Sequence, residues 1–197
     1  MTPKDGQEFD IQPLFFEYTL NSICTMLFGV SVDDLGYSEA EMSVFNDAEA
    51  MIRIKGLRTI HLSVLSKVLA KLYRSHQMEA AGRVFHKFVG DLLTKGLEIY
   101  NTKAKKETDQ RYVFLHDAMD RKNDLSRFKD EATNVLFAGR DTSAVLMSNV
   151  LWTLARNPLM WQNLQSEVAG LHGELPNYEV LKSMKYLNNV LKEGKCL

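Results

Sequence analysis

The chain has 197 residues, of which 45% are apolar, 10% aromatic and 25% charged, which is typical of a folded globular segment and excludes disordered and fibrous classes. Its 24 basic and 25 acidic residues give a net charge of -1, so there is no overall positive field and no nucleic-acid partner is expected. The two cysteines, Cys24 and Cys196, lie far apart and no Cys/His cluster has metal-ligand spacing, so neither a disulfide scaffold nor a metal site is predicted.

The residue pattern predicts a mainly α fold that extends over 1–197 as a single piece. Only four prolines and 11 glycines occur, and residues that favour helix are abundant. Gly29 is a plausible C-terminal cap for the first helix, Ser38 begins a capping box for the second, and Gly56 interrupts the pattern. The spacing of apolar residues predicts helices over 9–28, 38–54, 62–73, 78–100 and 111–119.

The longest predicted helix runs from Leu125 to Arg156. No proline occurs in these 32 residues, and the helix should extend about 48 Å, enough to cross a whole domain. Asn157 and Pro158 predict both its end and the start of the next helix, because asparagine caps a helix and proline suits its first position. Gly170 and Gly173 should end that helix, and Asn177 should cap the last one.

The sequence AGRDTS at 138–143 lies in the middle of the long predicted helix, where it should weaken the helix. A mid-helix glycine costs about 1 kcal/mol relative to alanine, and a threonine can donate a hydrogen bond back to an earlier carbonyl. In one interpretation, Gly139 lets a flat ligand approach the backbone while Asp141 and Thr142 deliver protons to an apolar site. In the other, Gly139 admits a neighbouring helix, Asp141 points to solvent and Thr142 is a core hydroxyl bonded to its own helix. The six residues alone leave both open.

Three segments in order resemble the cytochromes P-450, the haem-thiolate monooxygenases. Residues 136–144 (LFAGRDTSA) resemble the signature of that family's long central helix, and residues 155–168 resemble the helix that follows it. Residues 181–193 resemble the approach to its Glu-x-x-Arg motif. Arg140 makes the signature similar to the fungal branch that hydroxylates alkanes and fatty acids.

This resemblance implies an orthogonal helical array, incomplete here, around one long central helix over about 125–156, with haem as the cofactor. It also implies a small hydrophobic substrate and an NADPH-dependent reductase as partners, and an endoplasmic reticulum location for full-length relatives through an N-terminal anchor. The roles implied for single residues are a catalytic proton relay at Asp141 and Thr142, haem contacts at Ala138, Gly139 and Thr142, and substrate contacts at Phe137 and Val145.

The sequence departs from the family pattern in two ways. Cys196 stands where the Glu-x-x-Arg motif has its arginine, so Glu193 is a remnant of that motif, and no Phe-x-x-Gly loop supplies the axial thiolate. The N-terminal anchor and the early strands are not found either. We therefore expect a fragment from the middle of a monooxygenase that is inactive alone. The alternatives are a non-catalytic helical module that binds hydrophobic ligands and a gene remnant that does not fold.

Overall fold

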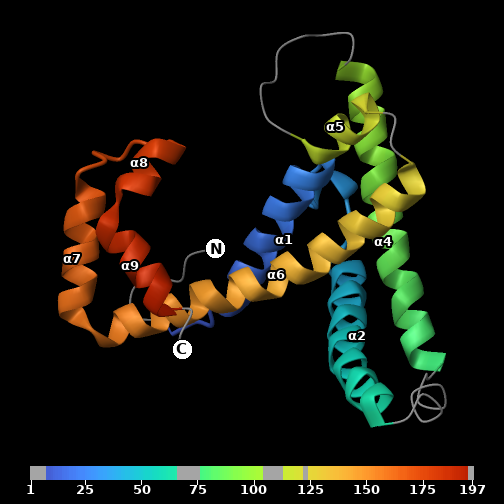
Figure 1. Cartoon of the computed structure of the whole chain (residues 1–197), viewed down its shortest axis with the longest axis horizontal. Helices are drawn as coiled ribbons and strands as arrows, with labels where there is room; N and C mark the ends of the chain where they lie inside the picture. The colour runs from blue at the N-terminus through green and yellow to red at the C-terminus, as the bar shows by residue number, and fades with distance from the viewer. Residues whose placement is uncertain (1–7, 66–75, 104–112, 122–123, 195–197) are drawn as a thin grey trace. The chain divides into compact units, whose positions relative to one another are not determined.

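The computed structural model describes residues 8–65, 76–103, 113–121 and 124–194, and within these ranges every regular element is helical. The mainly α prediction is therefore confirmed. The elements are α1 (Gln12–Phe28), η1 (Asp33–Leu35), α2 (Glu39–Leu65), α4 (His76–Lys103), α5 (Phe114–Asp120), α6 (Leu125–Arg156), α7 (Pro158–Ala169), α8 (Tyr178–Ser183) and α9 (Lys185–Gly194) (Figure 1). No described helix is both long and apolar enough to cross a membrane.

Several predicted helix ends are confirmed. Ser38 and Glu41 form the reciprocal capping box, because the Ser38 amide donates to the Glu41 carboxylate at 2.9 Å and the Glu41 amide donates to the Ser38 hydroxyl at 3.3 Å. Gly29 follows α1 with φ 71°, a left-handed conformation that glycine adopts without strain. The bounds predicted for α6 are those observed, and the Asn177 side chain accepts from the Val180 amide at 2.9 Å.

Two predicted boundaries are wrong. α2 continues through Gly56 to Leu65 and does not end near Ile54, because one glycine among helix-forming neighbours lowers helix stability without ending the helix. The chain after Asn177 forms two helices where one was predicted, since the backbone leaves the helical region at Met184, with ψ 91°. The predicted helix over 62–73 and the predicted exposed loop after Lys103 lie mostly outside the described residues.

The described helices divide into two compact units, and α1 and α6 each contribute to both. The first unit comprises Met1–Thr19 and Ala138–Leu197, and the second comprises Leu20–Phe137. The sequence predicts a single piece over 1–197, and this stays a prediction.

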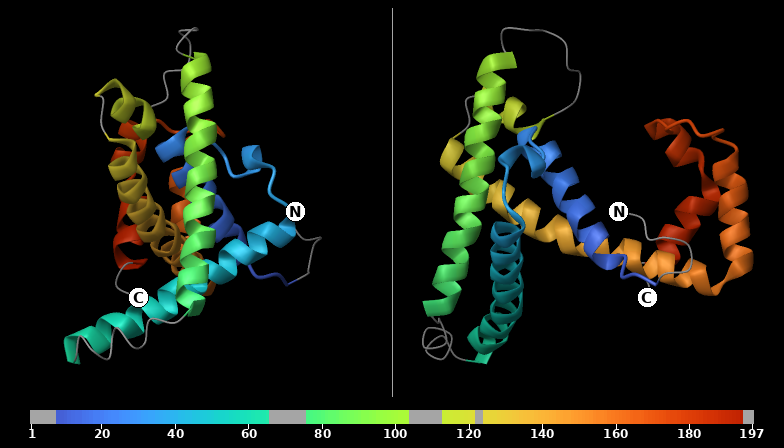
Figure 2. Two further views of the ribbon diagram at one scale, coloured as in Figure 1. Left: turned by 90° about the vertical axis from the view of Figure 1, so that its right-hand side faces the viewer. Right: turned by 180° about the vertical axis from the view of Figure 1, so that it is seen from behind.

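The second unit has an apolar core rich in aromatic rings. α2 and α4 lie side by side in it (Figure 2). Phe45 of α2 contacts Phe88 and Phe85 of α4, with ring centroids 4.2 Å and 5.4 Å away respectively. On the α1 side, the ring of Phe28 meets that of Phe128 edge-on at 5.9 Å. These contacts bury large side chains, which supplies most of the favourable free energy of folding in such a unit.

The first unit contains the second half of α6, which is followed directly by α7. Pro158 occupies the first turn of α7 as predicted, but the Asn157 side chain donates to the Thr153 carbonyl at 2.7 Å and makes no N-cap hydrogen bond. α7 and α9 lie side by side (Figure 1). α9 thereby returns the chain toward α6, which carries the candidate site.

Candidate functional site

The long helix α6 buries one row of side chains that recurs at every fourth residue. Because residues four apart lie on the same side of an α-helix, such a row faces neighbouring helices while other positions stay accessible. The buried members are Phe128, Ala132, Leu136, Arg140 and Ala144. Ala138, Thr142 and Val145 are exposed, and Val145 keeps 41% of its surface accessible. Two of the three candidate haem contacts, Ala138 and Thr142, therefore share an uncovered side of α6 with the candidate substrate contact Val145.

A hydrogen bond joins two of the candidate residues. The hydroxyl of Thr142 donates to the carbonyl oxygen of Ala138 at 2.7 Å, one turn earlier. The sequence analysis raised this bond under the interpretation in which Thr142 is a core hydroxyl, but Thr142 is exposed. The carboxylate-bearing neighbour Asp141 is partly buried, and so is Gly139. An acid and an exposed hydroxyl are thus neighbours in the sequence of α6, and their role as a proton relay stays a prediction.

Phe137 lies in a different environment. It is partly buried and packs against the core of the second unit, where its ring meets that of Phe85 edge-on at 5.4 Å. Phe137 is therefore a packing residue of the second unit. The predicted contact between Phe137 and a substrate stays a prediction.

The accessible side of α6 fits the approach of a flat group such as haem. Near the middle of the helix this side carries the small side chains of Ala138 and Thr142, with the exposed Val135 and Val145 on the turns before and after them. Cys24 is fully buried among the core residues of the second unit, so its thiol does not fit the role of a haem ligand. Cys196 lies outside the described residues. Within the part of the chain that the structure describes, no group of three or more His, Cys, Asp or Glu side chains could hold a metal ion.

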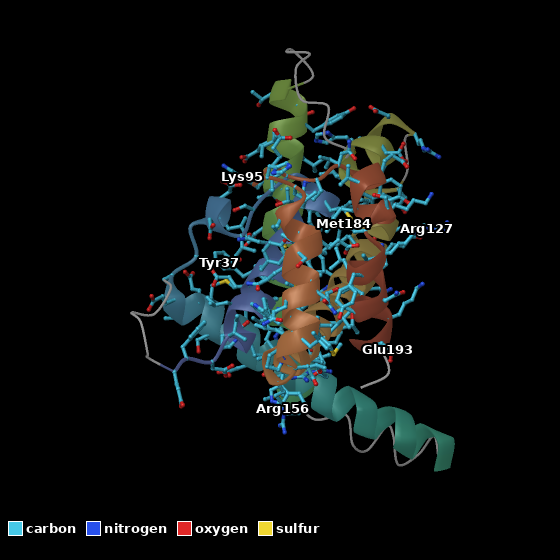
Figure 3. The ribbon with its side chains drawn as sticks, turned by 90° about the vertical axis from the view of Figure 1, so that its left-hand side faces the viewer. Tyr37, Lys95, Arg127, Arg156, Met184 and Glu193 are labelled. Carbon is cyan, nitrogen blue, oxygen red and sulfur yellow. The ribbon has the colours of Figure 1, made fainter. Side chains whose placement is uncertain are left out.

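The motif remnant Glu193 lies on the exposed side of α9, near its end (Figure 3). The next residue, Gly194, is buried against α6, and a Cβ placed on it would overlap the Val150 side chain and lie 3.4 Å from Leu146. α9 therefore ends in direct contact with α6, one to two turns beyond Thr142. The position of the motif's arginine lies outside the described residues.

Sequence reasoning missed the environment of Arg140. Its side chain is only 5% exposed, and the guanidinium lies 5.5 Å from the centre of the Phe16 ring of α1. A charged residue is buried only when its surroundings compensate for the loss of water, so Arg140 is an element of the first unit's packing. The four-residue spacing of Arg140 from Leu136 and Ala144 is the signal in the sequence that could have placed it in the buried row.

A comparison with protein families matches the model described as cytochrome P450 over residues 1–194. The chain belongs to the cytochrome P450 family. The resemblance drawn from residues 136–144, 155–168 and 181–193 is thereby confirmed, and the family's cofactor is haem.

Fungal members of the cytochrome P450 family are similar to almost the whole chain. The cytochrome P450 52A10 of Candida maltosa is 32% identical over 202 residues, which cover 95% of this chain and 38% of that protein. The cytochrome P450 monooxygenase himC of Aspergillus japonicus is 32% identical over 98% of this chain and 35% of its own length. The cytochrome P450 monooxygenase fsdH of Fusarium heterosporum is 31% identical over 98% of this chain and 36% of its own length. The chain thus spans little more than a third of these relatives.

Proposed function

We propose that this chain is the central segment of a haem-dependent monooxygenase that hydroxylates alkanes or fatty acids with dioxygen. The observation that carries the proposal is the exposed Thr142 on the accessible side of α6, directly after the partly buried acid Asp141, with the Thr142 hydroxyl 2.7 Å from the Ala138 carbonyl. The cytochrome P450 match over residues 1–194 supports it. It also supports the interpretation of residues 1–197 as one partial domain.

The haem, when bound, supplies the chemistry that activates dioxygen. The chain's own residues then have three tasks. Ala138 and Gly139 leave room for the ring beside the helix backbone. Thr142 holds a proton on its hydroxyl, and Asp141 exchanges that proton with solvent, so that protons reach an otherwise apolar site. Val145, on the same side of α6, and Phe137 contact the hydrophobic substrate.

The partners follow from the same proposal. A substrate with an unactivated C–H bond offers no polar group at the reacting carbon, so apolar side chains such as Val145 hold it by burial. The electrons come from an NADPH-dependent reductase, and we expect the full-length protein at the endoplasmic reticulum membrane.

We also propose that the 197 residues are inactive by themselves. The buried position of Cys24 supports this, because a thiolate inside an apolar core cannot reach an iron without disrupting that core. The test is the reduced carbon monoxide spectrum of the purified chain after addition of haem. We expect no absorption at the thiolate-ligated position, and such absorption would overturn the claim of inactivity.

The proposed reaction is tested by placing residues 1–194 in the frame of cytochrome P450 52A10 in exchange for the matching segment. We expect oxygen-dependent hydroxylation of lauric acid by this chimera. D141N and T142V should lower product formation by about 100-fold or more, the usual contribution of positioned proton transfer. S143A, at the exposed neighbour of Thr142, is the matched control and should retain activity. A T142V chimera as active as the unmodified one would contradict the proposed relay.

The two alternatives give different results with the purified chain. A far-ultraviolet circular dichroism spectrum without helical minima would favour the gene remnant. Tight binding of a fatty-acid probe without haem, combined with an inactive chimera, would favour the non-catalytic module.

A further inference from the structure

The carboxylate of Glu167 joins α7 to the first turn of α9. One carboxylate oxygen, Oε1, accepts a hydrogen bond from the Tyr186 amide at 3.0 Å, and the other, Oε2, accepts one from the Leu187 amide at 2.8 Å. The first amides of any helix have no acceptor within that helix. Glu167 therefore caps α9 from a different helix, and its negative charge also suits the positive end of the helix dipole.

A second side chain completes the junction between α8 and α9. The side-chain nitrogen of Asn188 donates to the Met184 carbonyl at 2.6 Å. The same nitrogen lies 3.1 Å from the Leu181 carbonyl and 3.3 Å from the Lys182 carbonyl. The Leu181 and Met184 carbonyls also accept backbone amides, those of Met184 and Asn188, so the Asn188 side chain adds to the hydrogen bonds at the end of α8. The interruption of the helix at Met184 thus has hydrogen bonds on both sides, from Asn188 to the end of α8 and from Glu167 to the start of α9. These bonds fix the direction in which α9 leaves α8.

The other end of α9 is held by α6. Gly194 is buried so closely against Val150 that an added Cβ would overlap the valine side chain. α6 and α7 are joined directly through Asn157, so α6, α7 and α9 form a triangle within the first unit. α6 meets α7 at the turn at Asn157, and α6 meets α9 at Gly194. α7 meets α9 where the Glu167 carboxylate accepts the two amides.

We propose that Glu167 is a positioning residue that acts through α9 on the segment of α6 that follows Thr142. This inference rests on the proposed function, in which the Thr142 hydroxyl relays protons. α9 meets α6 at Val150, and Leu146, one turn after Thr142, borders this contact, so a shift of α9 reaches the turn that follows that hydroxyl. Glu167 thus links the helix that bears Glu193 to the helix that bears the relay pair.

The test is amide hydrogen exchange in the purified chain, measured by NMR without haem. In E167A, we expect exchange at Tyr186 and Leu187 to accelerate at least tenfold, and exchange at Leu146 and Val150 to accelerate by a smaller factor. E167Q keeps one carbonyl acceptor and should restore the α6 amides to within about twofold of wild type. E179Q, at an exposed glutamate in the first turn of α8, is the matched control and should change none of these rates.

The outcomes separate positioning from local capping. Acceleration confined to Tyr186 and Leu187 would overturn the proposal, because it would leave α6 independent of Glu167. Acceleration over the whole chain would also overturn it, because it would indicate general destabilisation. If E167A does not fold, E167D, whose carboxylate is one methylene shorter, takes its place, and the same two outcomes would overturn the proposal. Because the exchange measurement does not use haem, its failure is distinct from an inactive chimera.

Discussion

Gly96 of α4 approaches the backbone of Phe28 so closely that a Cβ on the glycine would lie 2.6 Å from the Phe28 carbonyl oxygen. The same Cβ would lie 2.8 Å from a methyl carbon of Leu115. We expect Gly96→Ala to destabilise the second unit by about 1–3 kcal/mol, because the backbone and a packed side chain would both have to move. Urea denaturation followed by circular dichroism measures this change.

Gly82 provides the control on the same helix. No atom from the rest of the unit lies within 4 Å of a Cβ built at Gly82. Gly82→Ala should therefore stabilise the chain by about 0.5–1 kcal/mol, because alanine loses less backbone entropy in a helix. Equal stabilities of the two variants would show that α4 does not meet Phe28 at the observed distance.

A cluster of three polar side chains predicts a pH dependence of stability. The Tyr37 hydroxyl donates to Asp91 at 2.5 Å, and the Lys87 ammonium lies 2.8 Å from the same carboxylate oxygen. Partial burial opposes ionisation of Asp91, but hydrogen bonds from Lys87 and Tyr37, with the charges of Lys87 and Lys129, outweigh it and hold the pKa of Asp91 below its usual value. Burial and the bond to Asp91 raise the pKa of Tyr37, and the bonds to Asp91 and Tyr37 raise the pKa of Lys87.

The signs of these shifts define the pH range in which the cluster stabilises the fold. A depressed pKa of Asp91 adds stability above the unfolded value of about 3.9, and this stability is lost as pH falls through the folded pKa. The raised pKa values of Tyr37 and Lys87 add stability below about pH 10, which is lost as pH rises through their folded pKa values. Asp91→Asn should cost about 1 kcal/mol at pH 7 and less near pH 3. Urea denaturation at both pH values, with Asp47→Asn at an exposed carboxylate as control, checks this, and a pH-independent cost would contradict it.

Local signals in the sequence account for the helices but not for the contacts that orient them. The bounds of α6 were predicted because a proline-free run is followed by Asn157 and Pro158, and both act on their immediate neighbours. The break at Met184 was missed because no glycine or proline causes it. It is held by Glu167 from α7 and by Asn188 from the following helix, and only the folded chain brings these side chains together.

The candidate site shows the same limit. The residue types at Gly139, Asp141 and Thr142 indicated the chemistry, and helical spacing predicts that Thr142 shares a side of α6 with Ala138 and Val145. The placement of Phe137 could not be predicted, because it depends on Phe85, a residue of another helix. A phenylalanine next to a catalytic motif fits a substrate contact and a packing contact equally well from its sequence position.

A double-mutant cycle measures the packing role of Phe137. Phe85→Leu and Phe137→Leu should each destabilise the second unit, and their effects should couple by about 0.5–1.5 kcal/mol because the two rings meet edge-on. Chemical denaturation of the two single variants and the double variant gives the coupling energy. Additive effects would mean that the rings do not interact, and would leave Phe137 available for contact with a substrate.

The final prediction concerns two cation–π pairs in the first unit. The Arg140 guanidinium lies 5.5 Å from the Phe16 ring centre and is buried, whereas that of Arg156 lies 4.5 Å from the ring centre of Trp152, which is 61% exposed. The shorter distance and the tryptophan ring both favour a stronger interaction for Arg156 with Trp152, but burial favours a stronger interaction for Arg140 with Phe16. Because loss of water strengthens such an interaction from about 0.5–1 to about 2 kcal/mol, the Arg140–Phe16 pair should have the larger coupling energy. Cycles of R140M with F16L and of R156M with W152L, measured by urea denaturation, provide the comparison. A larger coupling for the exposed pair would show that separation outweighs burial here, and that Arg140 is not held in place by Phe16.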